Sequence, residues 1–420
     1  MAGRAGLFYG WRVAGASFVL AVFGWGIGFY GPPVFLNAVH EARGWSVALI
    51  STAVSVHFLV GALAGANLPA IHRCFGAPAA TKAGALCLAA GVFGWAAAAS
   101  PWQLFAASAL SGAGWGGMSA AALNQILFPW FERNRPAALA MAYNGGSVGG
   151  LIFSPLWVAA VAALGFASAA AAVGLVMAIT MWVLANLFFS RTPQQMGLAP
   201  DGLGRDTEPT PGLAPMTSPR ARPLPGPLLW SDRKFITLSA GMAMGLFAQI
   251  GLTAHLFSLL VPSLGAQRAG LAMGLVTAMA VAGRTLLGWL MPVGADRRLL
   301  ACTGYAVQLA GSIVLVAAQG AIVPLLLLGV ILFGAGFGNA TSLPPLIAQV
   351  EFVKDDQSRV VALIVGIAQG SYAFAPAVFG LLRELSPHPG EVAAAAPLVF
   401  AAAAVIQAMA IAAFLAGRCR

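Results

Sequence analysis

Charged side chains are scarce in this 420-residue sequence, in which Asp, Glu, Lys and Arg together make up 8%. A soluble domain carries about a quarter of such residues, because charged side chains cover its water-facing surface. Apolar residues, by contrast, reach 60%, and the mean hydropathy is +0.85. The composition argues against an ordinary soluble, secreted or nucleic-acid-binding protein and predicts a protein with many membrane spans.

Cysteine is also scarce: four residues lie far apart, without a C-x-x-C pair or a Cys/His spacing. Neither a disulfide framework nor a zinc site is therefore predicted. The apolar segments hold no His/Glu/Asp cluster and no serine–base arrangement. We expect no metal, no cofactor and no enzymatic activity, and we keep a membrane enzyme or sensor as the alternative from another functional class.

Twelve apolar runs are long enough to cross a bilayer, whose hydrocarbon core needs about 20 apolar residues per helix. Their predicted ranges are 13–36, 46–70, 79–99, 102–128, 137–163, 167–189, 235–261, 269–292, 299–318, 321–349, 359–382 and 397–416. A polar, proline-rich segment separates six runs from six and is predicted to be an unpacked linker. The sequence thus predicts an all-α membrane protein with 12 transmembrane helices, divided into an N-terminal six-helix bundle (1–190), a linker (191–234) and a C-terminal six-helix bundle (235–420).

The positions of Lys and Arg predict the orientation, because positive residues near short loops stay on the cytoplasmic side. With the N-terminus inside, 18 of the 22 Lys and Arg fall in inner segments, and only Arg43, Arg268 and Arg383 fall in outer loops. Both termini and the linker are therefore predicted to be cytoplasmic. The net charge of +10 reflects this topology rather than a nucleic-acid patch, and the high Arg and Ala content suggests a GC-rich bacterial genome and an inner membrane.

The two halves share sequence markers in register, at offsets of 221 to 224 residues. The pairs are Gly112-Ala-Gly-Trp-Gly116 with Gly334-Ala-Gly-Phe-Gly338, Gly146-Ser147 with Gly370-Ser371, and Pro155 with Pro376. Each half has an even number of helices and starts inside, so we predict two parallel six-helix repeats.

One cation lies deep within a predicted span: Arg284, with apolar turns on both sides. An arginine at such depth costs about 2.5–3.5 kcal/mol on insertion scales, and all 12 acids lie in loops or at span ends. We interpret the compensating anion as the substrate, whose carboxylate the guanidinium fork would hold. The alternatives are that Arg284 snorkels or bonds helix-end carbonyls, or that it binds a neutral polar substrate.

Other polar side chains within the spans are candidates to complete a substrate cavity. Those on helices expected to line it are Tyr30, Asn124, Tyr143, Gln369 and Tyr372. Hydrogen bonding between helices is the alternative role for each of them.

Two histidines, His57 and His255, are candidates to carry a coupled proton, because histidine changes charge near neutral pH. A neutral histidine bonded across a helix interface is the alternative. Gly61 is the repeat counterpart of Arg284, which places His57 one turn from the equivalent depth. His57 is therefore the better candidate.

Five short motifs carry a resemblance to a known family. They are Tyr9-Gly-Trp-Arg12 before the first span, Trp45-Ser46 at the start of the second, Trp130-Phe131 with Arg135 after the fourth, Thr192-Pro-x-x-Met-Gly197 after the sixth and Gly283-Arg284-x-x-x-Gly288 in the eighth. With them the chain resembles the major facilitator superfamily over its whole length, and within it the bacterial monocarboxylate transporter and oxalate/formate antiporter-like branch. The resemblance implies the major facilitator fold and binding of the substrate carboxylate by Arg284.

The sequence differs from that branch at positions that bear on coupling and on the charge of the expected substrate. Proton-coupled relatives carry an acid where this chain has Ala280 and a lysine where it has Gly31 to Pro33. Oxalate exchangers carry a second cation where this chain has Gln369 to Tyr372. A single cation suits a monoanion better than a dianion.

The superfamily also has an acidic-basic gating signature. It is reduced to Ala70-Ile-His72-Arg73 after the second span and kept as Asp296-Arg297 after the eighth. The resemblance therefore implies gating roles for Arg73, Asp296 and Arg297.

These observations predict a monomeric secondary transporter of a small organic monocarboxylate, which works by alternating access about a midplane site. The partners are the lipid bilayer, a small organic anion and, in proton symport, a proton; anion exchange is the other mode of coupling. The alternative function is export of a hydrophobic or amphiphilic compound, for which a large aromatic cavity matters more than one cation.

Overall fold

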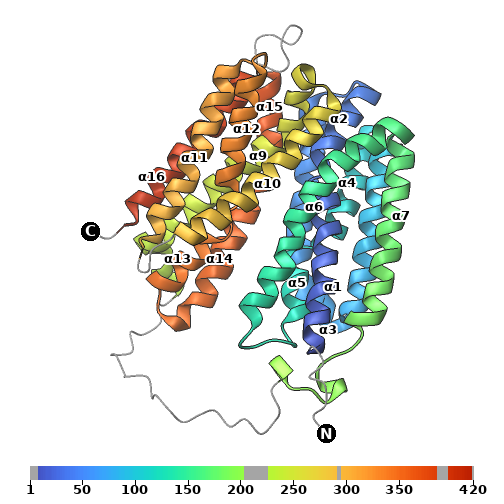
Figure 1. Ribbon diagram of the computed structural model, residues 1–420, viewed down its shortest axis with the longest axis vertical. Helices are drawn as coiled ribbons and strands as arrows, with labels where there is room; N and C mark the ends of the chain where they lie inside the picture. Colours follow the sequence, from blue (N-terminus) through green and yellow to red (C-terminus); the bar gives the residue numbers. More distant parts are fainter. Residues whose placement is uncertain (1–7, 203–225, 291–294, 386–395, 419–420) are drawn as a thin grey trace. The chain divides into compact units, whose positions relative to one another are not determined.

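The computed structural model describes residues 8–202, 226–290, 295–385 and 396–418. Within these ranges every regular element is a helix, as Figure 1 shows. In the N-terminal repeat the helices are α1 (Tyr9–Phe23), the π-helix η1 (Gly24–Phe29), α2 (Pro32–Arg43), α3 (Val47–Ala97), α4 (Pro101–Gly117), α5 (Ala120–Leu127), α6 (Arg135–Leu164), α7 (Phe166–Leu184) and the π-helix η2 (Ala185–Phe189).

The C-terminal repeat follows two short 3₁₀-helices, η3 (Gln194–Met196) and η4 (Pro200–Gly202), and the short helix α8 (Gly226–Ser231). Its helices are α9 (Arg233–Leu264), α10 (Ala266–Leu290), α11 (Arg297–Ala318), α12 (Val323–Phe337), α13 (Leu343–Glu351), α14 (Lys354–Tyr372), α15 (Ala375–Glu384) and α16 (Pro397–Ala416). The described ends of the polar linker therefore contain short helices.

The predicted spans are found in the described residues. Nine helical segments are long and apolar enough to cross a membrane by length and composition. One of them, α3, carries two predicted spans, because its backbone leaves the helical region at Gly76 with φ 79° and ψ 159°, a conformation that glycine adopts easily. The broken pairs α4–α5 and α12–α13 supply the remaining two, so the prediction of a 12-helix all-α membrane protein is confirmed.

Close helix crossings recur at equivalent positions of the two repeats. Between α3 and α4, a Cβ atom on Gly116 would lie 2.6 Å from the carbonyl oxygen of Gly61. Between α10 and α12, a Cβ atom on Gly338 would overlap the carbonyl oxygen of Ala280. The glycines that marked the sequence repeat therefore allow the same helix pair to pack closely in each half, as small residues do in membrane proteins.

Spatial contacts divide the chain into two compact units. Unit 1 comprises Met1–Tyr30, Val60–Gly150 and Leu164–Arg220, and unit 2 comprises Gly31–Leu59, Leu151–Ala163 and Ala221–Arg420. The units differ from the predicted bundles, because parts of α2, α3 and α6 pack with the C-terminal repeat inside unit 2. Within this unit Ser55 Oγ accepts a hydrogen bond from the Ala377 N–H (3.0 Å), and Glu384 accepts one from the Ala48 N–H (2.9 Å).

The contact of α6 with α1 gives a first prediction. A Cβ atom on Gly149 would overlap the carbonyl oxygen of Val22, whereas one on Gly370 in α14 would meet nothing within 4 Å. We expect Gly149→Ala to lower the free energy of unfolding by about 1–3 kcal/mol, because the backbones must separate. Gly370→Ala is the matched control and should be neutral or slightly stabilising, since alanine favours a helix by up to about 1 kcal/mol. Denaturant titration in mixed micelles measures both, and equal effects would contradict the crossing.

Candidate functional site

Arg284 is held at a helix end. Its Nε donates a hydrogen bond to the carbonyl oxygen of Gly338 (2.8 Å), directly after the last residue of α12, and its side chain is partly buried. The carbonyl groups at a helix C-terminus carry partial negative charge and stabilise a nearby cation. One of the alternatives predicted from the sequence is a bond from Arg284 to a carbonyl group at a helix end. The structure identifies this carbonyl group as that of Gly338.

The candidates of unit 1 lie on three elements. Tyr30 is buried and directly follows the π-helix η1, a type of helix found frequently at functional sites. Asn124 of α5 donates its side-chain N–H to the hydroxyl of Tyr143 on α6. The structure therefore pairs Asn124 with Tyr143, and their predicted role in substrate binding stays a prediction.

The candidates Tyr372 and His57 lie close together in unit 2. Tyr372 is the last residue of α14, where the helix breaks before α15. Its ring lies edge-on to Phe58, with centroids 6.1 Å apart, and Phe58 neighbours the buried His57. Gln369 lies one turn earlier on α14. Helix breaks expose backbone polar groups that transporters use for binding, so the surroundings of Tyr372 suit its predicted role.

His255 on α9 is completely buried, and its Nε2 lies 3.0 Å from the carbonyl oxygen of Pro376 near the start of α15. This geometry places a hydrogen on Nε2, since a carbonyl only accepts. Nδ1 has no hydrogen-bond partner among the described residues. This contact agrees with the alternative role for His255, a neutral histidine bonded across a helix interface. A role in proton coupling stays a prediction.

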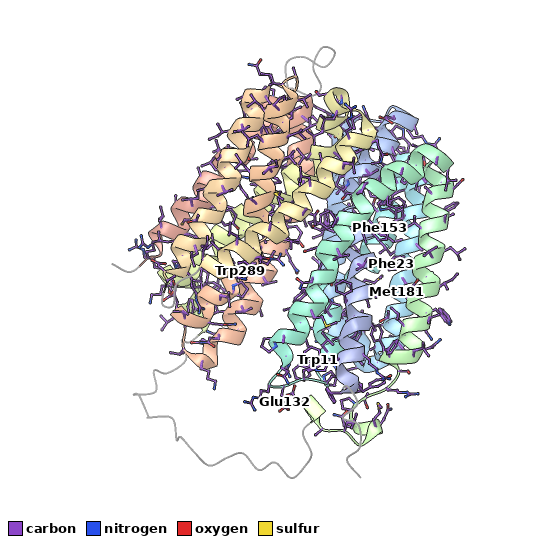
Figure 2. All side chains as sticks on the ribbon, in the orientation of Figure 1. Trp11, Phe23, Glu132, Phe153, Met181 and Trp289 are labelled. Carbon is purple, nitrogen blue, oxygen red and sulfur yellow. The ribbon has the colours of Figure 1, made fainter. Side chains whose placement is uncertain are left out.

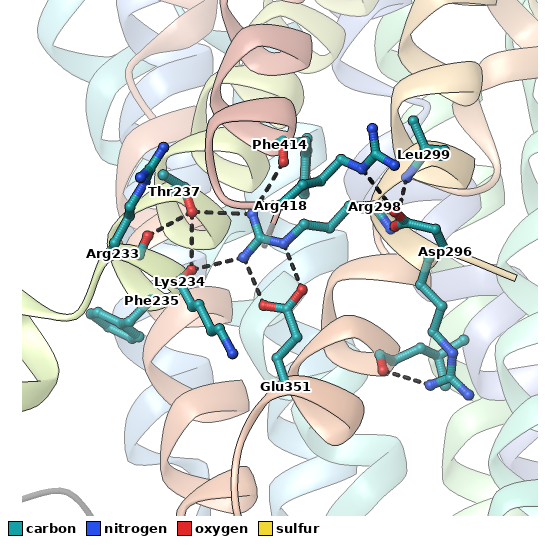
Figure 3. Close-up of polar contacts among 12 residues, drawn as sticks. Arg233, Lys234, Phe235, Thr237, Asp296, Arg298, Leu299, Glu351, Phe414 and Arg418 are labelled. Carbon is teal, nitrogen blue, oxygen red and sulfur yellow. Dashed lines mark hydrogen bonds and ion pairs between the residues drawn. The ribbon is translucent and has the colours of Figure 1, made fainter. Parts of the chain in front are cut away.

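Two predicted gating residues lie at the start of α11: Asp296, which Figure 3 shows, and Arg297. Asp296 caps the helix, accepting from the N–H groups of Arg298 and Leu299, and forms an ion pair with Arg418 at 2.7 Å. Burial raises the pKa of Asp296, but the bond from Arg418 and the two N–H bonds outweigh it, so the pKa lies below its ordinary value. Arg297 donates to the carbonyl oxygen of Leu346 in α13.

The third predicted gating residue, Arg73, lies in unit 1 near the break of α3 at Gly76. Its side chain is exposed. Within the described part of the chain no ion pair of Arg73 is found. Its gating role stays a prediction.

Sequence analysis missed the strongest ion pair of this region. The guanidinium of Arg298, only 2% exposed, donates from Nε and Nη2 to the two carboxylate oxygens of Glu351 at 2.6 and 2.8 Å. It also donates to Thr237 Oγ1 and to the carbonyl oxygens of Lys234 and Phe414. One side chain thus joins α9, α11, α13 and α16 (Figure 3).

The described residues contain no group of three or more His, Cys, Asp and Glu side chains that could hold a metal ion.

Residues 15–376 match the sequence model of the Major Facilitator Superfamily. The chain belongs to the Major Facilitator Superfamily. As a member of this family it is a multi-pass membrane transporter, and the predicted resemblance at the level of the superfamily is confirmed. A search of curated proteins found none that matches the sequence of this major facilitator protein.

Solved structures similar to this major facilitator transporter share its fold at low sequence identity. A point mutant of the nucleoside transporter NupG has a TM-score of 0.71 at 12% identity, over 96% of this chain and 99% of its own. A bacterial homologue of the human lysosomal transporter Spinster, inward-facing and unoccupied, has a TM-score of 0.70 at 15% identity, over 99% and 98%. A D-xylose-proton symporter has a TM-score of 0.69 at 13% identity, over 97% of each chain. At these identities the likeness concerns the fold alone.

Proposed function

We propose that this major facilitator transporter moves a small organic monocarboxylate across the bacterial inner membrane, with its termini in the cytoplasm. The observation that carries the proposal is the position of Arg284 on α10, with its Nε bound to the last turn of α12. The guanidinium fork matches a planar carboxylate. The short motifs shared with the monocarboxylate and oxalate/formate branch support the same substrate class.

The bond to Gly338 suggests how binding is coupled to movement. A helix C-terminus offers only about half an elementary charge, whereas a substrate carboxylate offers a full one. A carboxylate bound at Arg284 would add to this neutralisation, and a state closed to water on both sides would then become accessible mainly with cargo. Alternating access by the two six-helix repeats would then transport the anion, with His57 or His255 as the candidate carrier of a coupled proton.

Uptake of labelled acetate, lactate and pyruvate into proteoliposomes tests this proposal. We expect uptake of at least one monocarboxylate, competition by the others and no competition by a dicarboxylate such as oxalate, because one cation neutralises one charge. Preference for the dicarboxylate would contradict the proposed substrate class. An imposed pH gradient separates proton symport, which it drives, from anion exchange, which it leaves unchanged.

A second candidate function is export of a hydrophobic or amphiphilic compound. It is favoured by an aromatic cluster in unit 1, in which the ring of Trp115 lies 5.0 Å from Trp25 and 6.3 Å from Phe29. Aromatic side chains provide large apolar contact areas. Dye efflux that does not depend on Arg284 would favour this function over carboxylate transport.

A further inference from the structure

Three motifs that lie far apart in the sequence meet at one end of unit 1. The ring of Tyr9, before the first span, lies 5.3 Å from that of Trp130, after the fourth. Trp11 lies 5.1 Å from Phe131, and Trp11 and Glu132 lie at the same end of the unit in Figure 2. The third motif follows the sixth span and begins the segment 192–202, here called the strap. Transport chemistry at Arg284 does not explain this cluster.

The strap begins with a capping box. The Gln195 N–H donates to the Thr192 hydroxyl (3.3 Å), and the Thr192 N–H donates to the side-chain oxygen of Gln195 (3.0 Å). This reciprocal arrangement starts a helical turn. The motif after the sixth span therefore turns the chain back toward unit 1 instead of letting it extend.

The strap ends at Asp201, whose carboxylate binds three consecutive backbone N–H groups. Oδ2 accepts from Glu132 at 3.1 Å and from Arg133 at 2.7 Å, and Oδ1 accepts from Asn134 at 3.1 Å. Successive N–H groups that converge in this way form a nest for an anion. They directly precede α6, whose N-terminal dipole also favours negative charge.

The same loop has its carbonyl groups bound as well. The Asp201 N–H donates to the carbonyl oxygen of Trp130 at 3.0 Å, and Arg135 Nε donates to that of Phe131 at 2.9 Å. The guanidinium of Arg135 also lies over the ring of Phe128, 4.2 Å from its centre. In the loop between α5 and α6, the strap thus binds three N–H groups and the carbonyl group of Trp130, and Arg135 binds the carbonyl group of Phe131.

The backbone of the strap indicates that this contact is specified. Asp201 has a φ of 62°, and Gly202 has a φ of 71°, where a Cβ atom would lie 2.8 Å from the ring of Phe8. A residue other than glycine adopts this left-handed conformation rarely, and keeps it where its surroundings hold it.

We propose that the carboxylate of Asp201, here called the catch, anchors the strap to the backbone of the α5–α6 loop. The strap fixes this loop, and residues 192–202 of the linker thereby become a component of unit 1. The strap is a conformational device: it holds the backbone that carries Arg133 and Arg135 at the start of α6. Its effect on transport rests on the proposed function, whereas its effect on the loop does not.

The charge of the catch persists at neutral pH. Burial raises the pKa of Asp201, but the N–H bonds from Arg133, Asn134 and Glu132 outweigh burial and place it below its ordinary value. A group with a depressed pKa contributes stability above its ordinary pKa and loses it only as the pH falls through the depressed value. The carboxylate of Asp201 therefore keeps its hydrogen bonds to the loop across the physiological pH range.

Hydrogen exchange of the purified full-length protein tests the catch. In Asp201→Ala we expect the amides of residues 132–134 to exchange at least about tenfold faster, because each loses a charge-assisted bond. Asp201→Asn has the same shape, retains one acceptor oxygen and should show a smaller increase, so it keeps the test valid if the alanine variant does not fold. Asp232→Asn is the matched control, because Asp232 caps α9 through one N–H bond from Phe235, and exchange at 132–134 should not change. Unchanged exchange in both Asp201 variants would overturn the proposal.

Measurement of lactate uptake by the same variants tests whether the strap affects the rate of transport. We expect Asp201→Asn to lower the maximal rate of lactate uptake and to leave the half-saturating concentration unchanged, since the catch holds a loop backbone rather than a side chain proposed to bind substrate. Faster exchange with an unchanged maximal rate would overturn the role in transport. Absence of uptake in the wild-type protein would refute the proposed function and leave the exchange result standing.

Discussion

Replacement of Arg284 by alanine should reduce monocarboxylate uptake by about 30-fold or more. Removing one partner of a desolvated charge pair costs about 2–5 kcal/mol, because the remaining charge is left unpaired. In this protein the lost partner is the guanidinium whose Nε binds Gly338 at the end of α12. The substrate carboxylate would then lack the cation that is proposed to neutralise it.

Arg284→Lys should fall between the wild type and the alanine variant. Lysine keeps the charge, but its ammonium group is a point charge that cannot hold a carboxylate bidentately. Arg268→Ala provides the matched control, because Arg268 is exposed near the connection between α9 and α10 and should be dispensable. Initial rates in proteoliposomes measure all three variants, with equal reconstitution checked by immunoblot. Full uptake by Arg284→Ala would refute the proposed function.

The substrate class can also be probed through stability. A ligand that binds only the folded state stabilises it by about 2.7 kcal/mol at 100 times its Kd. Lactate or pyruvate should therefore raise the unfolding temperature of the wild-type protein and have no effect on Arg284→Ala. A ligand shift that persists in the alanine variant would place the carboxylate elsewhere.

The spans could be predicted from sequence because the bilayer leaves little choice. A backbone in hydrocarbon must satisfy its own hydrogen bonds, so a run of apolar residues forms a helix. The breaks within the spans could not be predicted in the same way. Average hydropathy is insensitive to a single unwound turn, and so it gave no sign of the π-helix η1 before Tyr30 or of the break after Tyr372.

The repeat could be predicted because glycine is needed where helices approach closely. Gly116 and Gly338 are equivalent in sequence, and each lies where the same pair of helices of its repeat crosses closely. The sequence did not indicate which element each glycine touches. Gly146 was marked by the repeat, yet it faces the ring of Trp25, and the backbone contact of α6 with α1 is made by Gly145 and Gly149.

The polar partners could not be predicted, because pairing depends on distances that the sequence does not contain. Glu351 is one of several acids at span ends, and Arg298 is one of many cations in loops that the sequence predicts to be on the inner side. Asp201 lies in a proline-rich segment that composition alone predicts to be unpacked. Only the fold shows that the first carboxylate faces a guanidinium and the second faces three amides.

Breaking the pair of Arg298 and Glu351 should destabilise the protein more than any other single change near the gating residues. We expect Glu351→Gln to lower the free energy of unfolding by about 3–5 kcal/mol, because it leaves a buried guanidinium without its counter-charge. Arg298 is 2% exposed and Glu351 is 19% exposed, so water has little access to the guanidinium. Its three other acceptors are a hydroxyl and two carbonyl oxygens, which are neutral.

The nearby pair of Arg418 and Asp296 is the matched control, since both side chains are 39% exposed. Arg418→Ala should cost at most about 1 kcal/mol, the usual value of an exposed ion pair. Denaturant titration in mixed micelles, followed by tryptophan fluorescence, measures both variants at low and high salt. Salt should reduce the small effect and leave the large one nearly unchanged, because a buried pair is weakly screened. Equal losses for the two variants would mean that burial of Arg298 does not govern the stability of this end of unit 2.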